Sequence, residues 1–283
     1  MTNNYGNLEL HQVLLAAMKD IDKICREHGL KYSLYAGSLL GAVNHKGLIP
    51  WDDDVDLVMF PYDFKKLCEV IDMHYTDRYQ LCTFDRVSDW YTQMNKILIK
   101  GTKVNYYSDG NSSPIFVDIN VLHNVPDKKW QRFLQRKQIE FINLILSTQS
   151  GAIIPSSPLT KLTLGNLAKI RREFWGQCLL KIMTHYDNRQ TEYVGIMCNT
   201  LTRNPYTGKS GYETDTVKRS WYENLVYVQY EDTQLMCIAN PKDDLDIRYG
   251  PKWAEPYPEE KRVTKHDVKS YEISPEVRER LGL

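Results

Sequence analysis

Four of the five positions from 52 to 56 are aspartate, and these residues are better suited to chemistry than any other run in the sequence. They are Asp52, Asp53, Asp54 and Asp56. Like charges this close repel one another, so the run disfavours folding unless something neutralises it. Carboxylate oxygens are the ligands that Mg²⁺ and Mn²⁺ prefer. The run therefore predicts a divalent metal site, and a solvated acidic turn is the alternative. An EF-hand loop starting at Asp52 fits poorly, since Leu57 and Asp63 stand where Gly and Glu belong.

The residues after the acidic run predict how it is held. Residues 54–60 are expected to form a strand, because their apolar half shows no alternation, as in a strand buried on both faces. Successive side chains of a strand point to opposite faces. Asp54 and Asp56 then share one face, with Asp53 opposite, and are predicted to bind the metal.

A third carboxylate is expected to join them from another strand. Residues 115–122 alternate, so that Phe116, Asp118 and Asn120 share one face. A charge in an otherwise apolar strand is costly without a partner. A neighbouring strand could bring Asp118 to the metal, and an ordinary aspartate at a strand edge is the alternative.

A glycine and a serine precede the acidic run at a point where a strand is expected to meet a helix. The strand is predicted at residues 32–36 and the first turns of the helix at 39–43, with Gly37 and Ser38 between them. Backbone amides at such a junction can hold a phosphate, aided by the helix N-terminus. By itself the pair is weak evidence, because most Gly-Ser pairs are plain turns.

Hydrophobic periodicity predicts the remaining elements. Helices are expected at residues 8–27, 62–73, 128–146 and 163–185. Strands are expected at 80–84, 93–99, 194–199, 225–230 and 235–239. Residues 150–160 are predicted to form a loop, and the Pro- and aromatic-rich tail from 250 to 258 to wrap the surface. Alternating strands and helices with antiparallel pieces indicate a mixed α/β core and a helical subdomain.

Composition narrows the class of protein further. Lys plus Arg and Asp plus Glu number 36 each, so the basic excess of a general nucleic-acid binder is absent. No apolar stretch is long enough for a transmembrane helix, and the N-terminus does not resemble a signal peptide. We therefore expect a cytoplasmic protein. Its six widely spaced cysteines are expected to be reduced core thiols; disulfides, or a structural zinc bound by scattered residues, are the alternatives.

The order strand, Gly-Ser, short helix and Asp-x-Asp on a strand is typical of nucleotidyltransferases. The segments Ala36–Ala42 and His45–Asp56 closely resemble the LicD family of that superfamily, which contains bacterial phosphocholine transferases and is related to fukutin-type transferases. Weaker resemblance continues at Lys96 with Thr102, Val117–Ile119, Tyr249-Gly250, Pro256–Arg262 and His266. We identify no such matching segment between about residues 125 and 225. Asn120–His123 departs from the family's usual Pro-Leu-Asp, and the cysteine cluster of the animal relatives is absent.

The resemblance implies a nucleotidyltransferase-like mixed β-sheet core flanked by helices, with a helical insertion. Residues 1–125 are expected to form the catalytic core and 126–190 a helical subdomain. Residues 191–283 are expected to add strands and a tail that complete the same domain as the core.

The resemblance also implies a reaction and the residues that carry it. Mg²⁺ or Mn²⁺ would bind Asp54, Asp56 and Asp118, and Asp118 would alternatively act as a base. The donor would be a CDP-linked alcohol such as CDP-choline. The acceptor would be a sugar or polyol hydroxyl of a cell-surface glycan, such as lipopolysaccharide or teichoic acid, and CMP would be released. Nucleotidyl transfer to a protein or small molecule, and a non-catalytic nucleotide- or metal-binding module, remain the alternatives.

Seven further residues are expected to contact the substrates. They are Gly37, Ser38, His45, Trp51, Lys96, Arg262 and His266. Gly37 and Ser38 would hold phosphate oxygens, and Lys96 would place a positive charge at the diphosphate. An exposed strand lysine, a core tryptophan and a loop histidine are the simpler explanations of Lys96, Trp51 and His45.

Overall fold

A computed structural model describes residues 5–83, 86, 94–107, 112–154, 156–197, 200–263 and 268–282. The chain divides into two compact units, which we describe separately. The first comprises Met1–Leu81, Lys96–Asn120 and Tyr222–Leu283, and the second Cys82–Asn95 and Val121–Trp221. The expected boundaries at residues 125 and 190 stay a prediction. No helix among the described residues is long and apolar enough to cross a bilayer.

A five-stranded sheet in the order β1-β2-β7-β4-β3 forms the centre of the first unit. Its strands are β1 (Ser33–Leu34), β2 (Asp56–Met59), β7 (Phe116–Val121), β4 (Asn95–Ile99) and β3 (Tyr79–Cys82). The pair β1 and β2 is antiparallel, with Ser33 opposite Val58. The mixed α/β class expected from the sequence is confirmed.

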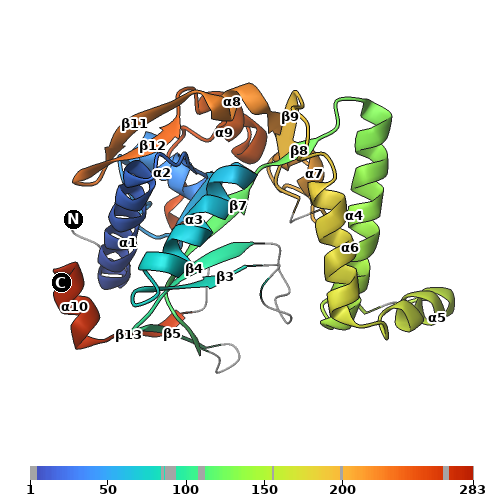
Figure 1. Ribbon diagram of the computed structural model, residues 1–283, viewed down its shortest axis with the longest axis horizontal. Helices are drawn as coiled ribbons and strands as arrows, with labels where there is room; N and C mark the ends of the chain where they lie inside the picture. The colour runs from blue at the N-terminus through green and yellow to red at the C-terminus, as the bar shows by residue number, and fades with distance from the viewer. Residues whose placement is uncertain are drawn as a thin grey trace. The chain divides into compact units, whose positions relative to one another are not determined.

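Three helices accompany this sheet in the first unit (Figure 1). They are α1 (Leu8–Glu27), α2 (Ala36–His45) and α3 (Pro61–His74). The bounds predicted for α1 are confirmed at both ends, because its apolar residues recur every three to four positions and are buried on one side. The helix ends before Gly29, which has a positive φ of 65°.

Smaller elements complete the first unit. A hairpin joins β11 (Leu225–Tyr230) to β12 (Thr233–Ile238), and a second sheet holds β13 (Val268–Ile273), β5 (Thr102–Tyr106) and β6 (Ser112–Ser113). The helices are α9 (Lys242–Tyr249), the short η1 (Glu259–Lys261) and α10 (Pro275–Leu281). Hydrophobic periodicity predicts β11 and β12 but not β5, β13, α9 and α10, which are short and weakly periodic.

Helices and a small sheet form the second unit (Figure 1). The helices are α4 (Lys129–Gln149), α5 (Pro158–Leu167), α6 (Arg172–Thr184) and α7 (Gly211–Asp215), and α8 (Arg219–Glu223) crosses the boundary between the units. The sheet has the order β10-β9-β8, from β10 (Thr216–Lys218), β9 (Tyr193–Gly195) and β8 (His123–Val125). The hydrophobic core of the second unit includes Ile139, Ile142, Leu179 and Met183.

The single helix predicted for residues 163–185 is wrong, because the chain breaks between α5 and α6. The backbone carbonyls at the break accept hydrogen bonds from side chains. Trp175 Nε1 donates to the Leu167 carbonyl at 3.1 Å, and the Gln149 amide donates to the carbonyls of Ala168 and Ile170. The loop predicted for 150–160 ends early, since Pro158 starts α5 behind a capping box formed by Ser157.

Several other predicted bounds need correction. The strand predicted from residue 54 begins at Asp56, and the helix predicted from residue 39 begins at Ala36. The strand predicted at 194–199 is the shorter β9; Cys198 and Asn199 lie outside the described residues, as do Phe84 and Gln93. Cys25, Cys178 and Cys237 are free thiols, as expected, and Cys68 and Cys82 are buried.

Candidate active site

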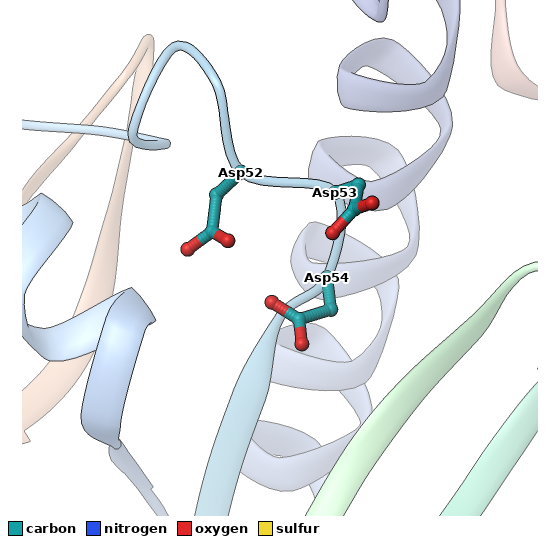
Figure 2. A group of neighbouring side chains, drawn as sticks. All are labelled: Asp52, Asp53 and Asp54. Carbon is teal, nitrogen blue, oxygen red and sulfur yellow. The ribbon is translucent and has the colours of Figure 1, made fainter. Parts of the chain in front are cut away.

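Three consecutive carboxylates converge on the loop between α2 and β2 (Figure 2). Asp52, Asp53 and Asp54 each offer one oxygen, and these oxygens lie within 4.8 Å of one another. Asp52 and Asp53 are buried and Asp54 is half-buried. This cluster could hold a metal ion, because it gathers hard oxygen donors at the edge of the core.

The placement expected for Asp53, opposite Asp54 and Asp56, is wrong. Strand pairing starts only at Asp56, so the alternation of a strand does not apply to the three residues before it. The loop backbone instead brings the Asp53 carboxylate to its two neighbours. Asp53 also borders a cavity of about 20 Å³. Burial of Tyr271, and secondarily the negative charge of Asp53, raise the pKa of Tyr271 to about 12.

Helix α2 positions the cluster through its first turn. A Cβ atom on Gly37 would lie 2.8 Å from Asp52 Oδ2, so only glycine leaves room for this carboxylate. Ser38 Oγ accepts a hydrogen bond of 2.9 Å from the backbone amide of Asp56. Both residues therefore hold the acidic loop in place, which the sequence did not indicate; a contact with phosphate stays a prediction.

Two further elements hold the same loop from other directions. The main-chain oxygen of Asp52 accepts hydrogen bonds from Asn7 Nδ2 at 2.9 Å and from His11 Nε2 at 2.7 Å. Glu231, between β11 and β12, accepts a hydrogen bond of 3.0 Å from the Leu48 amide. Its own amide donates to the Lys46 carbonyl at 2.6 Å. No local pattern predicts these contacts, because the partners are far apart in the chain.

The other two predicted ligands lie on the neighbouring strands β2 and β7. Asp56 Oδ1 accepts a hydrogen bond of 3.3 Å from Asn120 Nδ2, and the Asp118 amide donates to the Val55 carbonyl at 2.9 Å. The group of oxygens within 4.8 Å contains neither Asp56 nor Asp118. Of the three predicted ligands, Asp54 alone belongs to that group.

Lys96 on β4 forms an ion pair with Asp118 on β7. Its Nζ atom lies 2.6 Å from Asp118 Oδ1 and 3.3 Å from the centre of the Phe116 ring. Lys96 thus contacts both Phe116 and Asp118, which confirms that these side chains share a face. The Asp118 side chain is only 4% exposed, so the ammonium group compensates a buried charge.

Aromatic and basic residues gather around Trp51, next to the acidic cluster in sequence. Tyr257 stacks on Trp51 with ring centres 5.8 Å apart, and His45 meets Trp51 edge-on at 5.7 Å. The Arg262 guanidinium lies 5.2 Å from the Trp51 ring centre. Desolvation and the nearby charge of Arg262 lower the pKa of His45. His45, Trp51 and Arg262 are thus brought together; His266 lies outside the described residues.

Some residues of this region were not predicted from the sequence. Tyr257 lies within the segment Pro256–Arg262 that carried the family resemblance, so that segment contained a signal. Asn120 shares a face with Asp118 and could have been chosen by the same alternation. Burial, and after it the charge of Asp56, raise the pKa of Tyr249, which places this phenol near the acidic residues.

Comparison with known proteins identifies the class of the fold. Residues 29–149 match the family model described as the LicD/FKTN/FKRP nucleotidyltransferase domain. This segment contains the acidic cluster, Lys96 and Asp118. Residues 29–149 are therefore similar to the nucleotidyltransferase domain of that family, and the predicted resemblance and fold are confirmed.

Similarity to individual proteins extends beyond this domain. The chain is 24% identical over 270 residues to the lipopolysaccharide cholinephosphotransferase LicD of Haemophilus influenzae, and the match covers 93% of this chain and 98% of that protein. An uncharacterized protein of Rickettsia prowazekii is 38% identical over 64 residues, or 23% of each chain. The distant homology to LicD thus spans nearly the full chain.

Proposed function

We propose that this protein transfers a phospho-alcohol group, such as phosphocholine, from a CDP-linked donor to a hydroxyl group of a cell-surface glycan. The observation that carries the proposal is the convergence of Asp52, Asp53 and Asp54 within the segment similar to the LicD/FKTN/FKRP nucleotidyltransferase domain. The relative that matches nearly the full chain is named as a cholinephosphotransferase acting on lipopolysaccharide. That name supports CDP-choline as donor and lipopolysaccharide as acceptor.

The proposed reaction forms one P–O bond and breaks another. The acceptor hydroxyl attacks the distal phosphorus of the CDP-linked alcohol, and the bond to the bridging oxygen of the diphosphate breaks. CMP leaves, the hydroxyl proton passes to a base, and the phospho-alcohol remains on the glycan as a phosphodiester. Mg²⁺ or Mn²⁺ would neutralise charge on the diphosphate and the leaving CMP.

We assign the acidic residues to two tasks. Asp54, with the adjacent Asp52 and Asp53, would hold the cation, because their oxygens already lie within 4.8 Å of one another. Asp56 and Asp118 would complete the ligand set from β2 and β7, and Asp118 would alternatively accept the hydroxyl proton. Lys96, which pairs with Asp118, would contribute positive charge to the diphosphate.

The residues around Trp51 favour a phosphate-binding role over choline recognition. A quaternary ammonium binds the free faces of aromatic rings through cation–π attraction. The Arg262 guanidinium stands over Trp51, and Tyr257 stacks on the same ring. A second cation there would be repelled, so we propose that His45, Trp51 and Arg262 contact the nucleotide or its phosphates, together with Gly37 and Ser38.

A donor panel tests the proposed function. The purified chain would be incubated with lipopolysaccharide and CDP-choline, CDP-ethanolamine, CDP-ribitol, CDP-glycerol or ordinary nucleoside triphosphates. Mass spectrometry would identify the products with Mg²⁺, with Mn²⁺ and with a chelator. We expect CMP release and a phosphodiester on the glycan, only with a CDP-alcohol and a divalent metal.

Two outcomes would reject the proposal. Pyrophosphate release from a nucleoside triphosphate, with no response to any CDP-alcohol, would establish nucleotidyl transfer instead. Metal-dependent binding of a CDP-alcohol in titration calorimetry, without any product on lipopolysaccharide, would favour a non-catalytic binding module. The variant Asp243→Asn, at an exposed carboxylate on α9, serves as the control for the general effect of removing one acidic charge.

A further inference from the structure

The segment from Ile154 to Phe174 exposes five large apolar side chains. Within the second unit it comprises the approach to α5, α5 itself and the start of α6. Its exposed apolar residues are Ile154, Leu159, Leu162, Ile170 and Phe174, with exposed fractions from 40% to 81%. Isolated exposed apolar residues are common, but a concentration of them marks an interaction surface. We call this segment the helical tip.

Local structure holds these side chains outward. The capping box of Ser157 and Thr160 sets the start of α5, and Gln149 and Trp175 bind the carbonyls after its end. Leu159 and Leu162 are three positions apart on a helix and therefore neighbours, whereas Leu164 of the same helix is buried. The helix thus buries Leu164, while Leu159 and Leu162 remain exposed.

The helical tip carries an excess of positive charge. The segment contains four basic residues, Lys161, Lys169, Arg171 and Arg172, and one acidic residue, Glu173. Glu173 lies 3.4 Å from the Arg171 guanidinium, so an excess of positive charge remains. The whole chain has a net charge of zero, so this positive charge is concentrated here. Lys161, Lys169 and Arg171 are exposed next to the apolar residues of the helical tip.

This combination fits an anionic lipid surface. A short segment with exposed leucines and isoleucines flanked by Lys and Arg can bury its apolar side chains at the headgroup boundary while its cations stay at the phosphates. Basic residues near an anionic bilayer each add attraction that salt screens. A second copy of the chain is a poorer occupant, because a twofold contact would bring the same positive charges together.

We propose that the helical tip docks the protein on the surface of a bilayer that contains anionic phospholipids. Leu159, Leu162 and Phe174 enter the headgroup boundary, and Lys161, Lys169 and Arg171 lie at the lipid phosphates. Docking of this kind needs no transmembrane helix. It is independent of the proposed function, because it uses a surface that contains none of the proposed catalytic or substrate-binding residues.

Co-sedimentation with vesicles tests the proposal. The full chain would be mixed with vesicles of phosphatidylcholine alone or of phosphatidylcholine with phosphatidylglycerol, without donor or acceptor. We expect binding to the anionic vesicles, at least tenfold weaker binding to the neutral ones, and a loss of binding at high salt. Leu159→Glu with Leu162→Glu, and separately Lys161→Glu with Lys169→Glu, should each lower the partition coefficient at least tenfold.

The matched control is Tyr62→Glu with Met73→Glu, which changes two exposed side chains on α3 (71% and 65% exposed). We expect this control to bind vesicles like the unaltered protein, and circular dichroism melting curves should show that all variants fold. Equal binding to neutral and anionic vesicles, or unchanged binding of both tip variants, would overturn the proposal. The proposal would also be overturned if the protein bound no vesicles but self-associated, and if the leucine variants abolished that self-association. Transfer to a soluble acceptor would be unaffected by the tip variants, so failure here and failure of the proposed function are distinguishable.

Discussion

Individual residues in the first unit show how a repulsive acidic run is kept in a folded chain. The backbone oxygen of Asp52 is bound by Asn7 and His11, and its carboxylate lies against Gly37. These contacts restrain the main chain while the three carboxylates of residues 52–54 remain close together. A bound cation would reduce the electrostatic repulsion among these carboxylates. We therefore expect substitutions that relieve the repulsion to stabilise the metal-free protein and to weaken metal binding.

We predict that Asp54→Asn and Asp56→Asn each lower the turnover number at least about a hundredfold while the fold survives. Each change removes a negative charge from the place where we propose the cation and the diphosphate bind. The metal-free Asp54→Asn variant should melt at a slightly higher temperature, because it relieves repulsion. Transfer assays at saturating Mg²⁺ and thermal melts in chelator measure both effects, with Asp243→Asn as the control. Near-normal turnover in both variants would remove these residues from the proposed site.

We predict that Gly37→Ala weakens metal binding without unfolding the protein. Alanine suits a helix better than glycine by about 1 kcal/mol, so stability should hold or rise. The new Cβ would stand 2.8 Å from Asp52 Oδ2 and displace that carboxylate. Titration calorimetry with Mn²⁺ would measure the change in Kd. Gly165→Ala on α5 is the matched control, since its Cβ would meet nothing within 4 Å. Equal Mn²⁺ affinity in both variants would refute the role given to Gly37.

Among the elements, the hairpin of β11 and β12 acts on the acidic loop from far along the chain. Glu231 adopts a left-handed φ of 51° between the two strands and bonds to both Lys46 and Leu48. A Cβ on Gly47 would overlap the Glu231 carboxylate at 2.1 Å, so this glycine is required for the approach of the hairpin. The hairpin therefore restrains the chain between α2 and the acidic cluster.

We predict that Glu231→Ala lowers the free energy of unfolding by about 1–3 kcal/mol, because the Leu48 amide loses its acceptor. Turnover should fall as well, since the acidic loop loses a restraint. Glu231→Gln keeps an oxygen at the same place and should restore most of both properties. Urea unfolding and transfer assays on the two variants would separate the effects. If glutamine were as damaging as alanine, the negative charge of Glu231, and not its hydrogen bond, would be the important property.

For the whole molecule, buried histidine links stability to pH. Burial lowers the pKa of His11 below its ordinary value of 6.5, although the Asp52 carbonyl and nearby acidic residues act in the opposite direction. In the unfolded chain His11 takes up a proton near pH 6.5, whereas in the folded chain it resists protonation. The unfolded state then binds more protons, so the free energy of unfolding falls as the pH drops below about 6.5.

We predict that His11→Gln reduces this pH dependence. Urea unfolding between about pH 7 and about pH 5.5 should show a smaller loss of stability in the variant than in the unaltered protein. His74→Gln, at an exposed ring on α3, is the control and should leave the slope unchanged. An identical slope in the His11 variant would mean that other groups cause the acid sensitivity.

Local sequence was sufficient for the features that depend on neighbouring residues. Helical periodicity predicted α1 to the residue, and alternation correctly grouped Phe116 with Asp118 on β7. The acidic run and the preceding Gly-Ser pair led to the nucleotidyltransferase domain. These features could be predicted because backbone periodicity and short-range charge repulsion depend on spacing along the chain.

Tertiary structure alone decided the arrangement of the site. Asp53 joined Asp52 and Asp54 because strand pairing begins at Asp56, and pairing is a property of two segments. Arg262 and Tyr257 reached Trp51 across about two hundred residues of sequence, which no local pattern encodes. The break between α5 and α6 depended on donors from Gln149 and Trp175. Each of these outcomes required a partner that only the folded chain brings within a few ångströms.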